Sequence, residues 1–152
     1  MIAPRRYEKI AAFSKFNQFV EDLAKKVHNL GTSGDTLKVL LCNTAPVATN
    51  AVKGDLTEIS GGNGYTSGGT AATITASAQS SGTYKLVLAD VTFTASGGSI
   101  GPFRYAVLYN DTPSSPADPL IGYYDYGSSI TLASGESFTV DFDGSAGVLT
   151  LA

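Results

Sequence analysis

Residues 137–143, Ser-Phe-Thr-Val-Asp-Phe-Asp, decide the fold class of this chain. Phe138, Val140 and Phe142 alternate with polar residues, and a period of two places these three side chains on one face of a β-strand. A strand with one apolar and one polar face is typical of an antiparallel sheet that covers a core. The stretch therefore predicts β-structure, with Phe138, Val140 and Phe142 in the core.

Short β-rich runs separated by turn residues extend this pattern from residue 36 to the end of the chain. Residues 37–43 are almost wholly apolar, which is typical of a buried strand. We expect a two-sheet β-sandwich or jelly-roll-like domain over residues 35–152, because about nine short strands suit two packed sheets. The expected strands are 37–43, 71–76, 83–89, 91–95, 103–110, 120–126, 129–133, 137–143 and 147–151.

Glycine and proline mark the loops between these strands. Residues 61–69 are rich in glycine and predict a mobile surface loop. Residues 111–119 contain Pro113 and Pro116, and proline cannot continue a ladder, so we expect a protruding hairpin tip there. Tyrosines flank this tip, and phenolic rings are favoured both in cores and at interfaces. Both readings stay open for Tyr105, Tyr109, Tyr123, Tyr124 and Tyr126.

One amphipathic helix is expected before the β domain. Apolar residues recur at alternating steps of three and four between residues 13 and 30, and Gly31 is placed to end the helix. The expected apolar face consists of Phe13, Phe16, Val20, Leu23, Val27 and Leu30. We therefore expect residues 1–34 to form an N-terminal basic arm and a helix, and residues 35–152 to form the β-sandwich.

Charge is divided unevenly between these two parts. Residues 1–30 carry six Lys/Arg against three acids, a net charge of +3, while the rest carries four against ten, a net charge of −6. A basic arm before an acidic body indicates different partners for the two parts, and a solvated basic helix is the alternative explanation.

The composition suits one folded domain. With 152 residues, 15% charged residues and a mean hydropathy of +0.07, the chain is not a disordered polyelectrolyte. Cys42 is the only cysteine, so no intrachain disulfide can form. The sequence has neither a run of 18 apolar residues nor a signal-peptide pattern, so we expect a soluble protein made in the cytoplasm.

Few residues have the pattern of a catalytic or metal site. His28, the sole histidine, falls on the expected helix beside two lysines, and we expect a partly exposed side chain near the helix C-terminus. Cys42 ends an apolar strand and is expected in the core. The glycine-rich loop lacks the Gly-Lys-Ser/Thr ending of a phosphate-binding loop, and Asp141 and Asp143 offer only a weak calcium pattern. We therefore expect no enzyme activity, no cofactor and no metal.

Several stretches resemble a widespread family of structural proteins from the virions of tailed bacteriophages, and the likeness covers about residues 15–152. One is the helix segment 15–31, Lys-Phe-Asn-Gln-Phe-Val-Glu-Asp-Leu-Ala-Lys-Lys-Val-His-Asn-Leu-Gly. The others are residues 35–46, 61–69, 103–112 and 120–127, which include Asp-Thr-Leu-Lys-Val-Leu-Leu-Cys-Asn-Thr-Ala-Pro and Phe-Arg-Tyr-Ala-Val-Leu-Tyr-Asn-Asp-Thr.

The resemblance implies a capsid decoration (cement) protein on the capsid surface of the virion, assembled in the cytoplasm of a host bacterium. It further implies a homotrimer that contacts the major capsid protein or another virion protein, without membrane or specific nucleic acid. The family pattern contains no catalytic residues. We expect the contacts to come from the arm, the helix face and the proline-rich hairpin, namely Arg5, Arg6, Phe13, Phe16, Val20, Leu23, Val27, Tyr109, Pro113, Pro116 and Tyr123.

Two alternatives share the same sequence features. A tail, neck or baseplate component could use the same sandwich and arm, and the copy number per virion separates it from a capsid coat. A host-glycan-binding module would use the tyrosine-rich hairpin as its platform. An enzyme is the least supported class, because the sequence lacks a base, a metal set and a phosphate loop.

Overall fold

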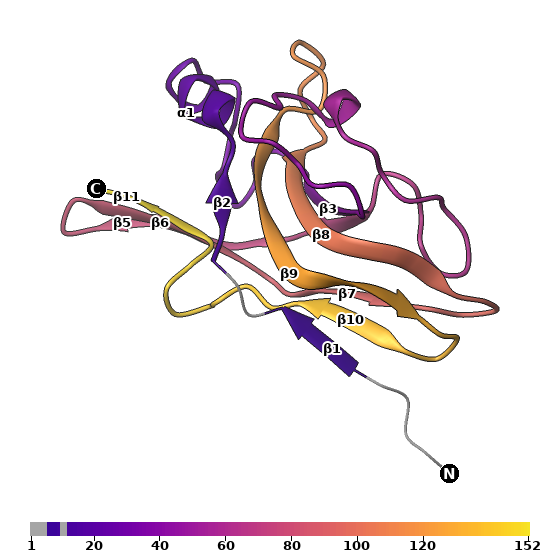
Figure 1. Cartoon of the computed structure of the whole chain (residues 1–152). Coiled ribbons are helices and arrows are strands. Elements are labelled where there is room, and N and C mark those ends of the chain that lie inside the picture. The colour runs from indigo at the N-terminus through magenta and orange to yellow at the C-terminus, as the bar shows by residue number, and fades with distance from the viewer. Residues whose placement is uncertain (1–5, 10–11) are drawn as a thin grey trace.

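The computed structural model describes residues 6–9 and 12–152 of the chain, and the arm residues 1–5 and 10–11 lie outside the described residues. Figure 1 shows a mainly β molecule with one short helix, α1 (Asn17–Ala24), and a 3-10 turn, η1 (Lys53–Asp55). The prediction of a mainly β sandwich preceded by a helix is confirmed.

The larger sheet has five strands in the order β2-β9-β8-β3-β4. Its neighbours pair antiparallel, and the long strands β8 and β9 form its curved centre in Figure 1. The bounds are β2 Ser14–Lys15, β9 Leu120–Leu132, β8 Ile100–Asn110, β3 Leu37–Cys42 and β4 Thr70–Ala72.

A three-stranded sheet in the order β1-β10-β7 lies below it in Figure 1. Its strands are β1 (Arg6–Lys9), β10 (Ser137–Val140) and β7 (Val91–Thr94). Strand β1 pairs in parallel with β10, so the backbone of residues 6–9 adds a strand to the sandwich.

We call the five-stranded sheet and the β1-β10-β7 sheet together the body. The third sheet, order β11-β6-β5, projects from the body in Figure 1, and we call it the wing. It consists of β11 (Leu149–Leu151), β6 (Thr83–Leu88) and β5 (Ile74–Ser80). Strand β6 continues almost directly into β7, so one stretch of chain joins the wing to the body.

The core lies between the five-stranded sheet and the β1-β10-β7 sheet. Phe138, Val140 and Phe142 are at most 3% exposed, which confirms the inward set of residues 137–143. The Phe138 ring meets Phe103 at 5.1 Å and Tyr126 at 5.7 Å between centroids, both edge to face. A second apolar cluster on the other face of the large sheet contains Phe16, Leu40, Cys42, Tyr105, Val107, Tyr109 and Leu120.

The expected helix over residues 13–30 is wrong in its extent, because α1 ends at Ala24. Lys26 adopts a left-handed φ of 63°, and its N–H donates to the carbonyl of Leu23. The N–H of Val27 donates to the carbonyl of Asp22, which completes a Schellman ending. Lys26, rather than Gly31, therefore occupies the left-handed position after the helix.

Two strands expected at 120–126 and 129–133 form the single strand β9. Gly127 has a φ of 97°, and its N–H donates to Asp125 Oδ1 at 2.8 Å. The register against β8 shifts between Phe103 and Tyr105, so the extra residues are absorbed as a bulge and the ladder continues.

Candidate interaction surface

Two phenylalanines attach α1 and its flanks to the body. Phe16 is fully buried in the second apolar cluster, with its ring 5.3 Å from that of Tyr123. Phe19 is 3% exposed and its ring lies 5.2 Å from the ring of His28. Val20, next to Phe19, is 54% exposed. The expected helix face is therefore shifted, because Phe19 points inward and Val20 points to solvent.

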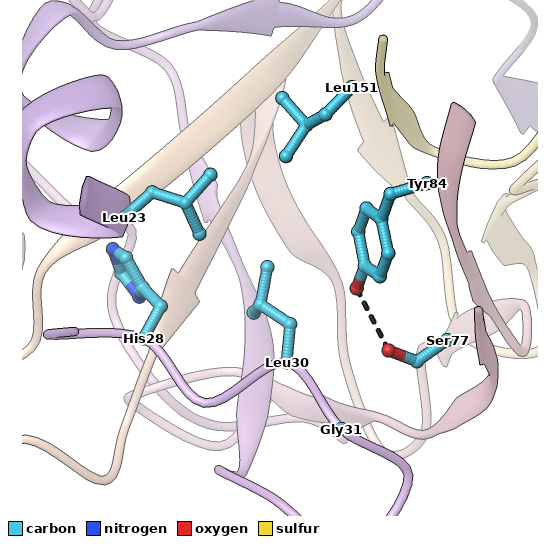
Figure 2. A pocket seen from close by; sticks show the side chains of 7 residues that line it. All are labelled: Leu23, His28, Leu30, Gly31, Ser77, Tyr84 and Leu151. Carbon is cyan, nitrogen blue, oxygen red and sulfur yellow. Dashed lines mark hydrogen bonds between the residues drawn. The ribbon is translucent and has the colours of Figure 1, made fainter. Parts of the chain in front are cut away.

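A cavity of about 280 Å³ separates the wing from α1 and the loop that follows it. Figure 2 shows its lining, in which the Tyr84 and Ser77 hydroxyls form a hydrogen bond at 2.9 Å. The wall is largely apolar, so the cavity suits an apolar side chain better than a charged ligand. The lining residues are Leu23, His28, Leu30, Gly31, Ser77, Tyr84 and Leu151.

A second hollow of about 380 Å³ involves the same strand, β11. Its lining consists of Phe13, Lys15, Phe19, Val148, Leu149, Thr150 and Leu151. Leu151 lines both hollows and is 44% exposed. We call the apolar residues of α1 and of these two hollows that are partly or fully exposed the wing surface, namely Phe13, Val20, Leu23, Tyr84, Leu149 and Leu151.

A third hollow of about 320 Å³ lies between α1 and the proline-rich hairpin tip. It brings Val27 and Pro116, two of the predicted contact residues, to one place. Its other lining residues are Gln18, Glu21, Asp22, Lys25, Ala51 and Val52.

The remaining predicted contact residues are dispersed. Phe16 and Tyr109 are fully buried inside the chain, whereas Pro113 and Tyr123 are partly exposed. Arg5 lies outside the described residues, and Arg6 begins β1, where its backbone pairs with Ser137. The tyrosines that flank the hairpin divide between core and surface: Tyr105, Tyr109 and Tyr124 are buried, while Tyr123 and Tyr126 are partly exposed.

The prediction of a partly exposed helical His28 is wrong. His28 lies four residues after the end of α1 and is 7% exposed. Burial lowers the pKa of its imidazole, although the carboxylates of Asp22 and Asp35 oppose that effect. The neutral ring is therefore the form that this site favours. A helix that ends at Ala24, rather than at Leu30, is what allows the ring to turn inward.

His28 belongs to a buried polar network that sequence reasoning missed. Asn110 is fully buried, and its Nδ2 lies 3.1 Å from His28 Nδ1 and 2.6 Å from Asp35 Oδ2. The backbone N–H of Thr112 donates to Asn110 Oδ1 at 3.1 Å. Asp22 Oδ2 and His28 Nε2 are buried atoms without a hydrogen-bond partner among the described residues. An asparagine at the end of an apolar strand was the only sequence signal for this network.

Cys42 and the glycine-rich loop, the other features named from the sequence, make contacts within the chain. Cys42 is fully buried, as expected, and burial raises the pKa of its thiol to about 12. The glycine-rich loop is exposed at residues 61–64, but Tyr65 within it is buried and donates to Glu58 Oε1 at 2.6 Å.

Within residues 6–9 and 12–152, no group of three or more His, Cys, Asp or Glu side chains is arranged to hold a metal ion. No helix in the same described part of the chain is long and apolar enough to cross a membrane. The described residues thus offer apolar hollows, whereas their buried hydrogen bonds are made within the chain.

Comparisons of the chain with protein-family models, with curated proteins and with solved structures find no match.

Proposed function

We propose that this chain is a structural protein of a bacteriophage particle, a capsid decoration protein that binds copies of itself as a homotrimer and the major capsid protein beneath. The proposal starts from the resemblance of residues 15–152 to tailed-phage virion proteins. A decoration protein needs many equivalent contacts, each of which can be modest because avidity multiplies them.

The wing surface is the observation that carries the proposal. Val20 and Leu151 leave 54% and 44% of their surface exposed, and Leu151 borders two apolar hollows. Exposed apolar surface beside unfilled hollows gains free energy when a partner covers it. A cyclic oligomer would repeat this contact at each copy.

The first experiment measures the mass of the full chain in solution by analytical ultracentrifugation. We expect a trimer for the natural sequence and a monomer for Leu151→Glu, because a carboxylate at the hollows cannot be buried without a partner. Val47→Glu is the matched control, since Val47 is 55% exposed and lines none of the three hollows described above. A natural chain that stays monomeric at high concentration, or a Leu151→Glu variant that stays trimeric, contradicts this contact.

The second experiment measures particle occupancy by gel, using point variants. Phe16 and Phe19 are core residues, so deleting residues 1–30 would unfold the body rather than test an arm. Arg5→Ser together with Arg6→Ser removes two positive charges and leaves Phe16 and Phe19 unchanged. We expect this variant to show lower particle occupancy than the natural chain. We also expect the occupancy of the natural chain to fall more steeply than that of the variant as the salt concentration rises, because salt screens the two additional charges. Unchanged occupancy would remove the arginines from the proposal.

Copy number decides between the head and the tail alternatives. Hundreds of copies per particle support a capsid coat, whereas a few or some tens support a tail, neck or baseplate component. Quantitative gel analysis of purified particles gives this number directly.

A further inference from the structure

Hydrogen bonding fixes the orientation of the Asn110 amide and hence the protonation of His28. One hydrogen of Asn110 Nδ2 goes to Asp35 Oδ2 at 2.6 Å, and Asn110 Oδ1 accepts from the N–H of Thr112 at 3.1 Å. The second hydrogen of Nδ2 faces His28 Nδ1 at 3.1 Å. His28 Nδ1 must therefore accept, and the neutral ring carries its proton on Nε2.

Protonation of the ring breaks this contact. A second proton on His28 Nδ1 would place a donor against the donor Nδ2 of Asn110. Asn110 cannot turn its amide over without losing its bonds to Asp35 and Thr112. The contact between His28 and Asn110, at the end of β8, therefore depends on a neutral ring.

Two carboxylates near His28 favour the protonated form of its ring. The carboxylates of Asp22 and Asp35 are the charges that act on the ring, and Tyr84 of β6 lines the same cavity. Asp22 Oδ2 is a buried acceptor without a hydrogen-bond partner among the described residues, and the charge of the Asp22 carboxylate favours the protonated ring. His28, Leu30 and Gly31 all line the cavity of Figure 2, so a movement of this loop changes the cavity wall.

We propose that His28 is an acid-released latch: protonation of its ring breaks the contact between His28 and Asn110, so that the loop of residues 27–35, then held to Asn110 only through Asp35, loosens and widens the cavity beside the wing. The latch itself stands on the described hydrogen bonds. Its consequence for assembly, a weaker contact through the wing surface in acid, rests on the proposed function.

The direction of the pH effect follows from the preferred protonation states. The freed loop exposes an imidazole with an ordinary affinity for protons, near pH 6.5, while the closed loop binds the proton more weakly. Below about pH 6.5 the open state therefore binds more protons, and its population rises by up to about tenfold per pH unit until the closed ring also titrates. Above that pH the ring contributes no pH dependence.

Hydrogen exchange and NMR on the full chain test the latch. Because His28 is the sole histidine, its imidazole resonances can be followed without overlap from another histidine. We expect amide exchange in residues 27–35, corrected for intrinsic rates, to rise by up to about fivefold from pH 6.5 to 5.5, because the open-state ring is already half protonated at pH 6.5. Exchange in the body strands β8 and β9 stays unchanged over this range.

Three variants separate the latch from a general effect of acid. His28→Gln keeps an acceptor for Asn110 but does not titrate, so the rise in exchange should vanish. Asp22→Asn removes a charge that favours the protonated ring, so the imidazole should titrate at lower pH. Asp141→Asn is the control, because Asp141 is exposed and is not among the groups that act on His28, and it should behave like the natural chain.

Two results would overturn the latch: an imidazole that titrates at its ordinary pH, or an unchanged rise in exchange in His28→Gln. The outcome is independent of assembly. If the chain is monomeric at every pH while residues 27–35 still open in acid, the latch stands and the wing-surface trimer fails. If a trimer forms but no opening occurs, the trimer stands and the latch fails.

Discussion

The core of the body and the wing surface are both apolar, but the core is buried within the chain, whereas the wing surface is partly exposed. In the core, the Phe138 ring of β10 meets Phe103 of β8 and Tyr126 of β9 edge to face, so that two sheets close on one another. At the wing surface, Leu151 comes from a three-residue strand and borders two unfilled hollows. Long ladders close a core by themselves, whereas short strands and a two-turn helix leave apolar surface for another molecule.

Truncating one residue in each region gives the largest contrast. Phe138→Ala should lower the free energy of unfolding by about 3–5 kcal/mol, because Phe138 is 1% exposed and the ring leaves a cavity. Leu151→Ala should cost about 1 kcal/mol or less in a dilute sample, because Leu151 is already 44% exposed. Urea denaturation followed by circular dichroism measures both values.

Protein concentration sharpens this contrast. If the wing surface is an interface, the cost of Leu151→Ala must grow as the concentration rises, because association stabilises the natural chain by mass action. The cost of Phe138→Ala stays constant, since its contacts lie within one chain. Equal costs for the two variants at low concentration would show that the wing is packed as tightly as the body.

Local patterns in the sequence predicted the body well. The alternation of Phe138, Val140 and Phe142 is a property of seven consecutive residues, and the sheet buries all three. The helix boundary was not predictable in the same way, because Lys26 takes a left-handed conformation that periodicity does not reveal. The steps of three and four also selected Val20 over Phe19, although the tertiary contact with His28 buries Phe19.

The candidate surface was only partly within reach of the sequence. The strand expected over residues 147–151 is present in the shorter form β11, Leu149–Leu151, so the sequence predicted the strand itself. It did not predict the hollows, because Leu23 and Leu151 meet only after the wing folds beside α1. The buried network has the same character, since His28 and Asn110 are 82 residues apart and their pairing is a tertiary event.

Two glycines with the same conformation test how closely the body is packed. Gly69 and Gly82 have φ values of 79° and 82°. A Cβ on Gly69 would lie 1.8 Å from the carbonyl oxygen of Val39, whereas a Cβ on Gly82 in the wing hairpin meets nothing within 4 Å. Gly82→Ala should cost about 1 kcal/mol for the conformation alone, and Gly69→Ala about 3 kcal/mol because the backbone must also move.

Thermal unfolding of the two glycine variants checks this difference. The gap between them reports the close approach alone, because the left-handed conformation is common to both. Equal losses would mean that the loop before β4 can move away from β3 without cost, and the body would then be less rigid than its ladders indicate.

Two tyrosine hydroxyls give the smallest and most specific comparison. In the body, the Tyr65 hydroxyl donates to Glu58 Oε1 at 2.6 Å and accepts from the N–H of Leu41 at 3.1 Å. In the wing, the Tyr84 hydroxyl bonds to the hydroxyl of Ser77 at 2.9 Å, its one partner among the described residues. Tyr65→Phe leaves a buried N–H and a part-buried carboxylate without this partner, and should cost about 2 kcal/mol.

Tyr84→Phe should cost about 0.5 kcal/mol or less, because Tyr84 and Ser77 are only partly buried and water can replace the lost partner. Chemical denaturation at neutral pH measures both values, and each variant keeps its aromatic ring, so the packing volume is nearly constant. If Tyr84→Phe lowers the free energy of unfolding as much as Tyr65→Phe does, the cavity beside the wing excludes water as the core of the body does. That result would count against the wing surface as a place where a partner binds, because a surface already closed within one chain has little left to gain from a second.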